Sequence, residues 1–348
     1  MINKKSSLPK NEINSVFTLY TNGSFQEAIA KIKVLNAKYP NQPILFNLIG
    51  ACYKQLGQLE GAAKMFKIAV SINPKYAEAH FNLGATLQAL DNIEAAINSY
   101  SKAIEITPNY PDAHNNLGNI LLDLGQYEAA IESLKWALSY KHDLSEAHNN
   151  LGNAYNKCGR VDLAIKSFEK AIFYNPYYEK AYFNLALSFK DLGNKEGFLK
   201  NIEKTLDIKP EWGAANYHLS QVKKCKKNDP KIAEIHAYLD RVDLDITDRV
   251  NLNFALAKSY EDIENYNKQF KFLNEGNNLR KKELNYSIER DLKLFSRIKE
   301  AFNPYNSDIK NTSSKSDSLR PIFILGMPRS GTSLVHQILE SHNEVHGA

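Results

Sequence analysis

Apolar and small residues recur along most of this chain with a constant period. With Pro43, Ala77, Pro111, Ser145 and Glu179 as first residues, successive units are 34 residues long. Inside each unit, apolar positions return at intervals of three and four residues, which is typical of helices that bury one face. The pattern therefore predicts two helices in each unit and a stacked array of such pairs.

The same kind of residue returns at five places of the unit. The fourth place is large, the seventh aliphatic, the eighth and twentieth mostly small, and the twenty-fourth aromatic or aliphatic. Small residues allow the two helices to approach closely, and large residues fill the spaces between neighbours. One unit cannot bury its own apolar face, so stacking must build the core. The residues at these places are, in turn, Phe46, His80, His114, His148 and Tyr182; Ile49, Leu83, Leu117, Leu151 and Leu185; Gly50, Gly84, Gly118, Gly152 and Ala186; Ala62, Ala96, Ala130 and Ala164; and Phe66, Tyr100, Leu134, Phe168 and Ile202.

Glycine and proline separate the predicted helices. Glycine between the two helices of a unit suits a turn with positive φ, and proline ends the second helix because it lacks the N–H. These residues are Gly57, Gly125, Gly159 and Gly193, and Pro74, Pro108, Pro176 and Pro210. The pattern resembles the tetratricopeptide repeat. The resemblance implies an all-α tetratricopeptide solenoid, a right-handed superhelix of antiparallel helix pairs with a concave groove.

The repeat pattern weakens at both ends, which suggests a division of the chain. We expect a polar tail over residues 1–8, repeats over 9–246 with the last one degenerate, and bridging helices over 247–302. A serine-rich stretch without periodicity predicts a linker over 303–319.

The segment 320–348 has a different character. Pro321 to Leu325 is a short apolar run that predicts a strand buried on both faces. Gly326 to Ser333 is rich in small and hydroxyl residues, and apolar residues at helical spacing follow. A strand, a tight loop and a helix N-terminus together form a binding site for an anion, because loop N–H groups and the helix dipole both point at it.

The spacing of Gly326 and Gly331 matches the first part of a nucleoside-triphosphatase P-loop. However, Thr332 stands where that loop has lysine, and the positive charge lies inside the loop at Arg329. The pattern therefore disfavours a P-loop nucleoside triphosphatase or kinase and favours the binding of a single 5′-phosphate that carries a transferable group.

This loop resembles the 5′-phosphosulfate loop of the sulfotransferase superfamily, and in particular tyrosyl-protein sulfotransferases and bacterial tetratricopeptide-sulfotransferase proteins. The match runs through Pro328, Arg329, Ser330, Gly331, Thr332, Ser333 and Leu334. The resemblance implies that the first six residues bind 3′-phosphoadenosine-5′-phosphosulfate (PAPS) and that Arg329 acts in catalysis. Residues 320–348 would then be the strand-loop-helix start of an α/β sulfotransferase domain.

In the resembling proteins, a glutamate that is the expected general base follows further along the chain. Here its position would fall just beyond Ala348, so we expect the general base to be absent from this chain. We therefore expect a fragment that is inactive alone, cut from a sulfotransferase acting on protein hydroxyls, with tyrosine as the expected acceptor. The solenoid would recruit the peptide or a protein partner. The alternative is a non-catalytic scaffold for protein–protein interaction.

Asparagine occupies the sixth place of four successive units. A side-chain amide has donors and an acceptor, so a column of amides on the first helices can hold an extended peptide regardless of its sequence. The arrangement resembles the asparagine ladder of the tetratricopeptide O-GlcNAc transferase, although asparagine is also a common consensus residue at this place. The column is Asn82, Asn116, Asn150 and Asn184, with Asn119 and Asn153 at the ninth place as further polar contacts.

Charge and composition exclude several functions. The formal net charge of +5 is small for 348 residues and does not imply nucleic acid. No run is long enough for a membrane span, and the N-terminus lacks the apolar region of a secretory signal. We therefore expect a cytoplasmic protein without a membrane partner. Lysines 223, 224, 226 and 227 form a basic cluster that is either a solvated helix end or a patch that attracts anions.

No metal site is expected. Cys52, Cys158 and Cys225 are isolated and suit packing in a reducing compartment. The repeated histidines at the fourth place lie on separate helices, one repeat apart, where they cannot converge on one ion. Packing is the expected role of these histidines.

Overall fold

The structure is a computed structural model that describes residues 8–302. In this range the chain forms 17 α-helices and no strand. The linker and the strand-loop-helix expected over 303–348 lie outside the described residues. The helices of the regular repeats and of the unit before them are α1 (Lys10–Thr21), α2 (Phe25–Lys38), α3 (Pro43–Gln55), α4 (Leu59–Ile72), α5 (Ala77–Ala89), α6 (Ile93–Ile106), α7 (Pro111–Asp123), α8 (Tyr127–Tyr140), α9 (Ser145–Lys157), α10 (Val161–Tyr174), α11 (Glu179–Asp191) and α12 (Lys195–Ile208).

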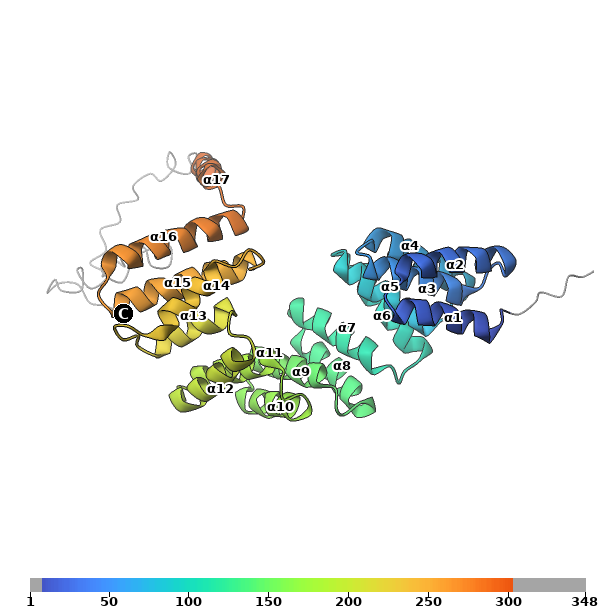
Figure 1. The fold of residues 1–348 in the computed structure, drawn as a ribbon, viewed down its shortest axis with the longest axis horizontal. Helices are drawn as coiled ribbons and strands as arrows, with labels where there is room; N and C mark the ends of the chain where they lie inside the picture. Colours follow the sequence, from blue (N-terminus) through green and yellow to red (C-terminus); the bar gives the residue numbers. More distant parts are fainter. Residues whose placement is uncertain (1–7, 303–348) are drawn as a thin grey trace, which may run out of the picture. The chain divides into compact units, whose positions relative to one another are not determined.

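Five helices begin at the residues that the 34-residue period selects. They are α3, α5, α7, α9 and α11, and each packs most extensively on the helix that follows it. The second helix of each pair also contacts the first helix of the next pair. Figure 1 shows these pairs following one another in chain order from α3 to α12. The predicted array of helix pairs is confirmed.

The close approach within a pair depends on the small residue at the eighth place. A Cβ atom added to Gly152 would lie 2.5 Å from Cε1 of Phe168, and one added to Gly50 would lie 2.7 Å from the same atom of Phe66. Both rings are fully buried. The sequence predicted the close approach at the eighth place. The structure adds that the large side chain of the second helix fills the space that the glycine leaves in the same pair.

The turn between paired helices needs a positive φ. Gly57, Gly125, Gly159 and Gly193 have φ between 70° and 75°. In the second unit Asp91 takes the same place with φ 58°, which is the left-handed region that aspartate tolerates better than most residues.

The regular pairing ends after α12. The next four helices are α13 (Gly213–Val222), α14 (Pro230–Leu239), α15 (Ile246–Asp262) and α16 (Tyr266–Glu283). The main partner of α13 is α15, not α14, and the backbone N–H of Gly213 donates to Oδ1 of Asp248 at 2.8 Å. The shorter α14 lies against α15. The sequence predicted a degenerate repeat here, and the structure shows that α15 takes the place of its second helix.

The chain divides into two compact parts, and the boundary lies between Asn285 and Tyr286. The second part contains α17 (Ile288–Phe302). Its side chains Ile288, Leu292 and Phe295 share one face of the helix and are about half exposed. Among residues 8–302, no helix is long and apolar enough to cross a membrane.

Candidate functional site

The loop of Pro328, Arg329, Ser330, Gly331, Thr332 and Ser333 lies outside the described residues. Its assignment to PAPS stays a prediction from the sequence. The general base expected just beyond Ala348 also stays a prediction, and no described residue is assigned its role. The other predicted site, the asparagine column, lies on the first helices of four successive pairs and is described in full.

Each asparagine of the column is half-buried and donates one hydrogen bond inside the array. Nδ2 of Asn82, Asn150 and Asn184 donates to Oδ1 of an asparagine one repeat earlier, at 3.0, 3.1 and 2.9 Å. Nδ2 of Asn116 donates instead to the hydroxyl of Tyr100 at 3.2 Å. The amides are therefore held in orientation by the preceding unit, and each Nδ2 keeps a second hydrogen for another partner.

The acceptors of these bonds form a second set that the sequence analysis missed. They are the fifth-place residues Asn47, Asn115 and Asn149, which are 5% exposed or less. Asn115 and Asn149 are 34 residues apart, which was visible in the sequence. The sequence did not show that a fifth-place amide accepts a hydrogen bond from a sixth-place amide of the next unit. In the second unit Phe81 occupies the fifth place, which is why Asn116 turns to Tyr100.

Asn119 and Asn153 lie three residues after Asn116 and Asn150 on α7 and α9, on the same side of each helix, and both are half-buried. Within the described residues, their side chains have no hydrogen-bond partner. Together with the column they give a row of polar groups in which each amide carbonyl can accept and each amide nitrogen can donate.

The repeated histidines have a structural partner. Nε2 of His80, His114 and His148 donates to the carbonyl six residues earlier, at 3.0, 3.0 and 2.8 Å. This bond ties the first helix of a unit to the turn before it. In residues 8–302 no group of three or more potential metal ligands converges.

Protonation of His148 is expected to destabilise the array. Burial lowers the pKa of His148, and because Nε2 carries the proton, Nδ1 is buried without a partner. The unfolded chain, with a pKa of about 6.5, then binds the proton first. Stability from this group is present above about pH 6.5 and is lost as the pH falls below it. Burial lowers the pKa of His218 and His236 too, and they act in the same direction.

Denaturant unfolding at several pH values between neutral and mildly acidic measures this loss. His148→Tyr, which introduces the residue that the next unit has at this place, should reduce the pH dependence. His80→Tyr, at the same place in a more exposed position, is the matched control and should change it less. An unchanged pH dependence in His148→Tyr would assign the effect to other groups.

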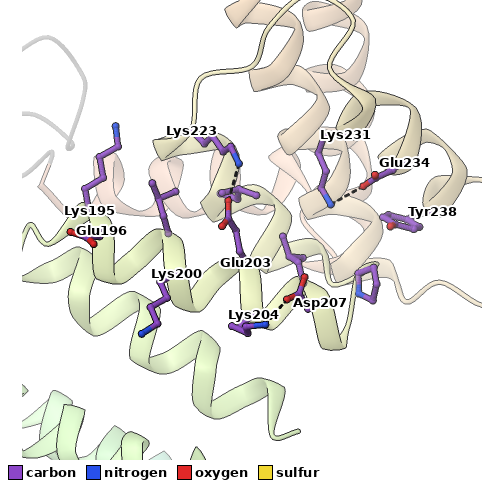
Figure 2. Close-up of a pocket in the computed structure, with 14 residues that line it drawn as sticks. Lys195, Glu196, Lys200, Glu203, Lys204, Asp207, Lys223, Lys231, Glu234 and Tyr238 are labelled. Atoms are coloured by element: carbon purple, nitrogen blue, oxygen red, sulfur yellow. Dashed lines mark hydrogen bonds and ion pairs between the residues drawn. The ribbon is translucent and has the colours of Figure 1, made fainter. Parts of the chain in front are cut away.

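A wide trough lies between α12, the end of α13 and α14. Its volume is about 1210 Å³. Figure 2 shows Lys223 and Glu203 pointing toward each other across it at 2.8 Å, and Lys231 bonded to Glu234 on α14 at 3.1 Å. In the basic cluster predicted at 223–227, Lys223 forms an ion pair with Glu203, and all four lysines are exposed.

Models of the tetratricopeptide repeat match residues 50–91, 89–125, 118–159, 145–178 and 179–211. These repeats are tetratricopeptide repeats. A model described as the sulfotransferase family matches residues 321–348, which contain the predicted loop.

An uncharacterized protein of Aquifex aeolicus (strain VF5) is 34% identical to this chain over 129 residues. The match covers 37% of this chain and 17% of that protein, so the chain spans about a sixth of the relative's length. Among solved structures, the Cut9–Hcn1 hetero-tetramer of APC/C is similar with a TM-score of 0.55 and 17% identity, over 69% of this chain and 48% of that chain. This likeness concerns the fold.

The structure of YrrB, described as a tetratricopeptide protein with an unusual peptide-binding site, has a TM-score of 0.45 and 21% identity. It covers 51% of this chain and 92% of that chain.

Proposed function

We propose that this chain is part of a PAPS-dependent sulfotransferase in which a tetratricopeptide array recruits a protein substrate. The observation that carries the proposal is the uninterrupted loop Pro328 to Leu334, inside the segment 321–348 that the sulfotransferase family model matches. Tyrosine hydroxyls are the proposed acceptors. The repeats over 9–246 would bind protein, 247–302 would bridge to the catalytic part, and 303–319 would link them.

The loop residues suit the binding of a phosphosulfate. Backbone N–H groups and the hydroxyls of Ser330, Thr332 and Ser333 are donors to the 5′-phosphate, which PAPS contributes together with its sulfuryl group. Arg329 places a positive charge beside the negative charge that develops as the S–O bond to the phosphate breaks and the bond to the acceptor oxygen forms. A general base, expected just beyond Ala348, must take the hydroxyl proton.

The asparagine column supports peptide recruitment. Asn82, Asn150 and Asn184 are oriented by one hydrogen bond each to the preceding unit, which lowers the cost of ordering them on binding. The remaining N–H and the carbonyl can pair with a peptide backbone in both directions. A row with one amide per repeat suits an extended chain and selects little for side chains.

Arg329→Ala is expected to weaken binding of adenosine 3′,5′-bisphosphate about 10- to 100-fold, because hydrogen bonds to a charged group are worth about 1.5–3 kcal/mol. Calorimetry on the protein encoded by the complete reading frame measures this. Binding to an array of tyrosine-containing peptides should be unchanged in this variant. The reciprocal variant, with Asn150 and Asn184 both changed to alanine, should lose peptide binding and keep the nucleotide.

Three outcomes separate the candidate functions. Equal nucleotide affinity in wild type and Arg329→Ala would refute the site assignment. Peptide binding without any binding of the bisphosphate by wild type would favour the non-catalytic scaffold. Binding of ATP or GTP in preference to the bisphosphate would favour a P-loop enzyme.

A further inference from the structure

A carboxylate stands at the second place of three successive units. These residues are Glu78, Asp112 and Glu146, and each is exposed in the first turn of its helix. We call them the carboxylate row. Each lies four residues before an asparagine of the column, so the row and the column share one face of α5, α7 and α9.

No described cation neutralises the carboxylate row. Within residues 8–302, these three carboxylates form no ion pair, and Nδ2 of Asn47 donates to Oε1 of Glu78 at 3.1 Å. Apart from histidines, the other charged residues of these helices are Asp123 and Lys157, at the far ends of α7 and α9. They lie about 16 Å along the helix axis from the row. The second place of the next unit is Lys180, so the row ends at α9.

Two tyrosines lie close to the row. Burial, followed by the charges of Glu78 and Asp112, raises the pKa of Tyr110 to about 12. Burial, followed by the charge of Glu146, raises the pKa of Tyr178 to about 12. Both phenols therefore stay neutral near pH 7 and keep their hydrogen. A tyrosine ring close to a carboxylate suits an ammonium or guanidinium group, which pairs with the charge and is attracted by the ring.

A buried amide on the same face suits a peptide backbone. Asn149 is 4% exposed, and its Oδ1 accepts a hydrogen bond from Asn184 at 2.9 Å. Its Nδ2 has no hydrogen-bond partner in the described part of the chain, and it is not among the unpaired atoms there that are shut off from solvent. This nitrogen is therefore reachable and can donate to a backbone carbonyl. An isolated cation would leave the donor unused, whereas a basic peptide would use both it and Glu146, three residues earlier on α9.

The spacing of the row matches one peptide conformation. First helices of successive units are joined by side-chain hydrogen bonds, such as that from Asn150 to Asn115 at 3.1 Å, and the axes of packed helices are about 8–10 Å apart. A polyproline II chain has three residues per turn and rises about 3.1 Å per residue, so every third side chain points the same way, about 9 Å from the last. A β-strand would turn every third side chain to the opposite face.

We propose that the carboxylate row and the asparagine column together bind a basic peptide in the polyproline II conformation, with a lysine or arginine at every third residue. The inference rests on the peptide recruitment proposed above and adds the class of peptide. The amides hold a backbone of any sequence, and the carboxylates select cationic side chains. Because the formal net charge of the chain is +5, its overall charge does not attract a basic peptide, and the local carboxylates must do so.

Fluorescence anisotropy on the full chain tests the proposal with labelled peptides. The probe is a peptide of four Lys-Ala-Pro repeats. It should bind more tightly than four Glu-Ala-Pro repeats, and more tightly than a peptide of the same composition whose lysines are adjacent. Its affinity should fall as salt is added, because salt screens exposed charges.

A variant without the three charges tests the row directly. It carries Glu78→Gln, Asp112→Asn and Glu146→Gln. An exposed ion pair changes affinity by only a few fold, so the loss of all three should weaken binding of the lysine peptide about tenfold at low salt. Binding of the glutamate peptide should not weaken.

The second helices offer a matched control. It carries Glu60→Gln, Glu94→Gln and Asp162→Asn, which remove the same charge from the first turns of α4, α6 and α10. Net charge and the interaction with the helix dipole change equally in the two variants. The control should bind the lysine peptide with nearly the affinity of wild type.

The outcomes separate this inference from the function on which it rests. If peptides of both charges bind equally, and the variant of Asn150 and Asn184 loses both, peptide recruitment stands and charge selection is refuted. If wild type binds neither peptide, recruitment and selection both fail. An equal loss in the row variant and its control would assign the effect to net charge and overturn the proposal. Equal affinity for spaced and adjacent lysines would overturn the assignment of one cation to each unit. If the row variant unfolds, which thermal melting detects, Glu146→Gln compared with Asp162→Asn decides alone.

Discussion

Replacing Phe168 with alanine is expected to lower the free energy of unfolding by about 3–5 kcal/mol, the usual cost of truncating a buried aromatic residue. The ring is fully buried between α9 and α10 and lies against Gly152. Because glycine has no side chain to move into the vacated space, and the neighbours are held by their own repeat, the cavity should persist.

Denaturant unfolding monitored by circular dichroism measures this loss of stability. Two further variants test whether it comes from the packing of Phe168 on Gly152. Phe168→Leu, which copies the Leu134–Gly118 pair of the third unit, should cost less than about 1.5 kcal/mol. Gly152→Ala should be costly in wild type, because its Cβ meets the ring, and much less costly in Phe168→Ala. Additive effects in this double-mutant cycle would contradict direct packing of the two residues.

The regular part of the fold was accessible from the sequence because its determinants are local and repeated. The period selected the first residues of α3, α5, α7, α9 and α11, and the small residues at the eighth place predicted the close approach of the two helices in a pair. Several independent signals recur at the same spacing: a helix start in every unit, a turn glycine in four of the five, and a large buried residue on the second helix.

The helix packing at the C-terminal end of the array could not be predicted from the sequence in the same way. The helix that packs on α13 is α15 and not α14. This pairing depends on contacts that follow no repeated pattern, such as the hydrogen bond from the Gly213 N–H to Asp248, 35 residues later. The weakening of the repeat pattern predicted a degenerate unit here, but it did not show which helix packs on α13.

The candidate sites were also predicted only in part from the sequence. The sequence located the asparagine column on the first helices, but the bonds that orient Asn150 and Asn184 run to buried asparagines whose role appears only in three dimensions. For Arg329 and its loop the sequence pattern carries the assignment, because phosphate loops are defined by short, contiguous motifs.

Gly213→Ala is expected to destabilise the C-terminal end of the array by about 3 kcal/mol, the upper end of the usual cost of overpacking. A Cβ at this position would lie 2.4 Å from the carbonyl oxygen of Asp248 and 2.7 Å from its Cα. These atoms belong to the backbone of α15 and cannot turn aside as the tip of a side chain can. The bond from the Gly213 N–H to Asp248 would be strained by the same displacement.

Because contacts in a repeat array are confined to neighbours, the damage should stay local. Hydrogen exchange should accelerate in α13 and α15, and α3 to α8 should keep the protection of wild type. Glu179→Ala, at the first place of the preceding unit, is the matched control and should change stability by less than about 0.5 kcal/mol. Retained protection of α15 in Gly213→Ala would show that the two helices can separate without loss, and that the exchange of partners at the end of the array contributes little to its stability.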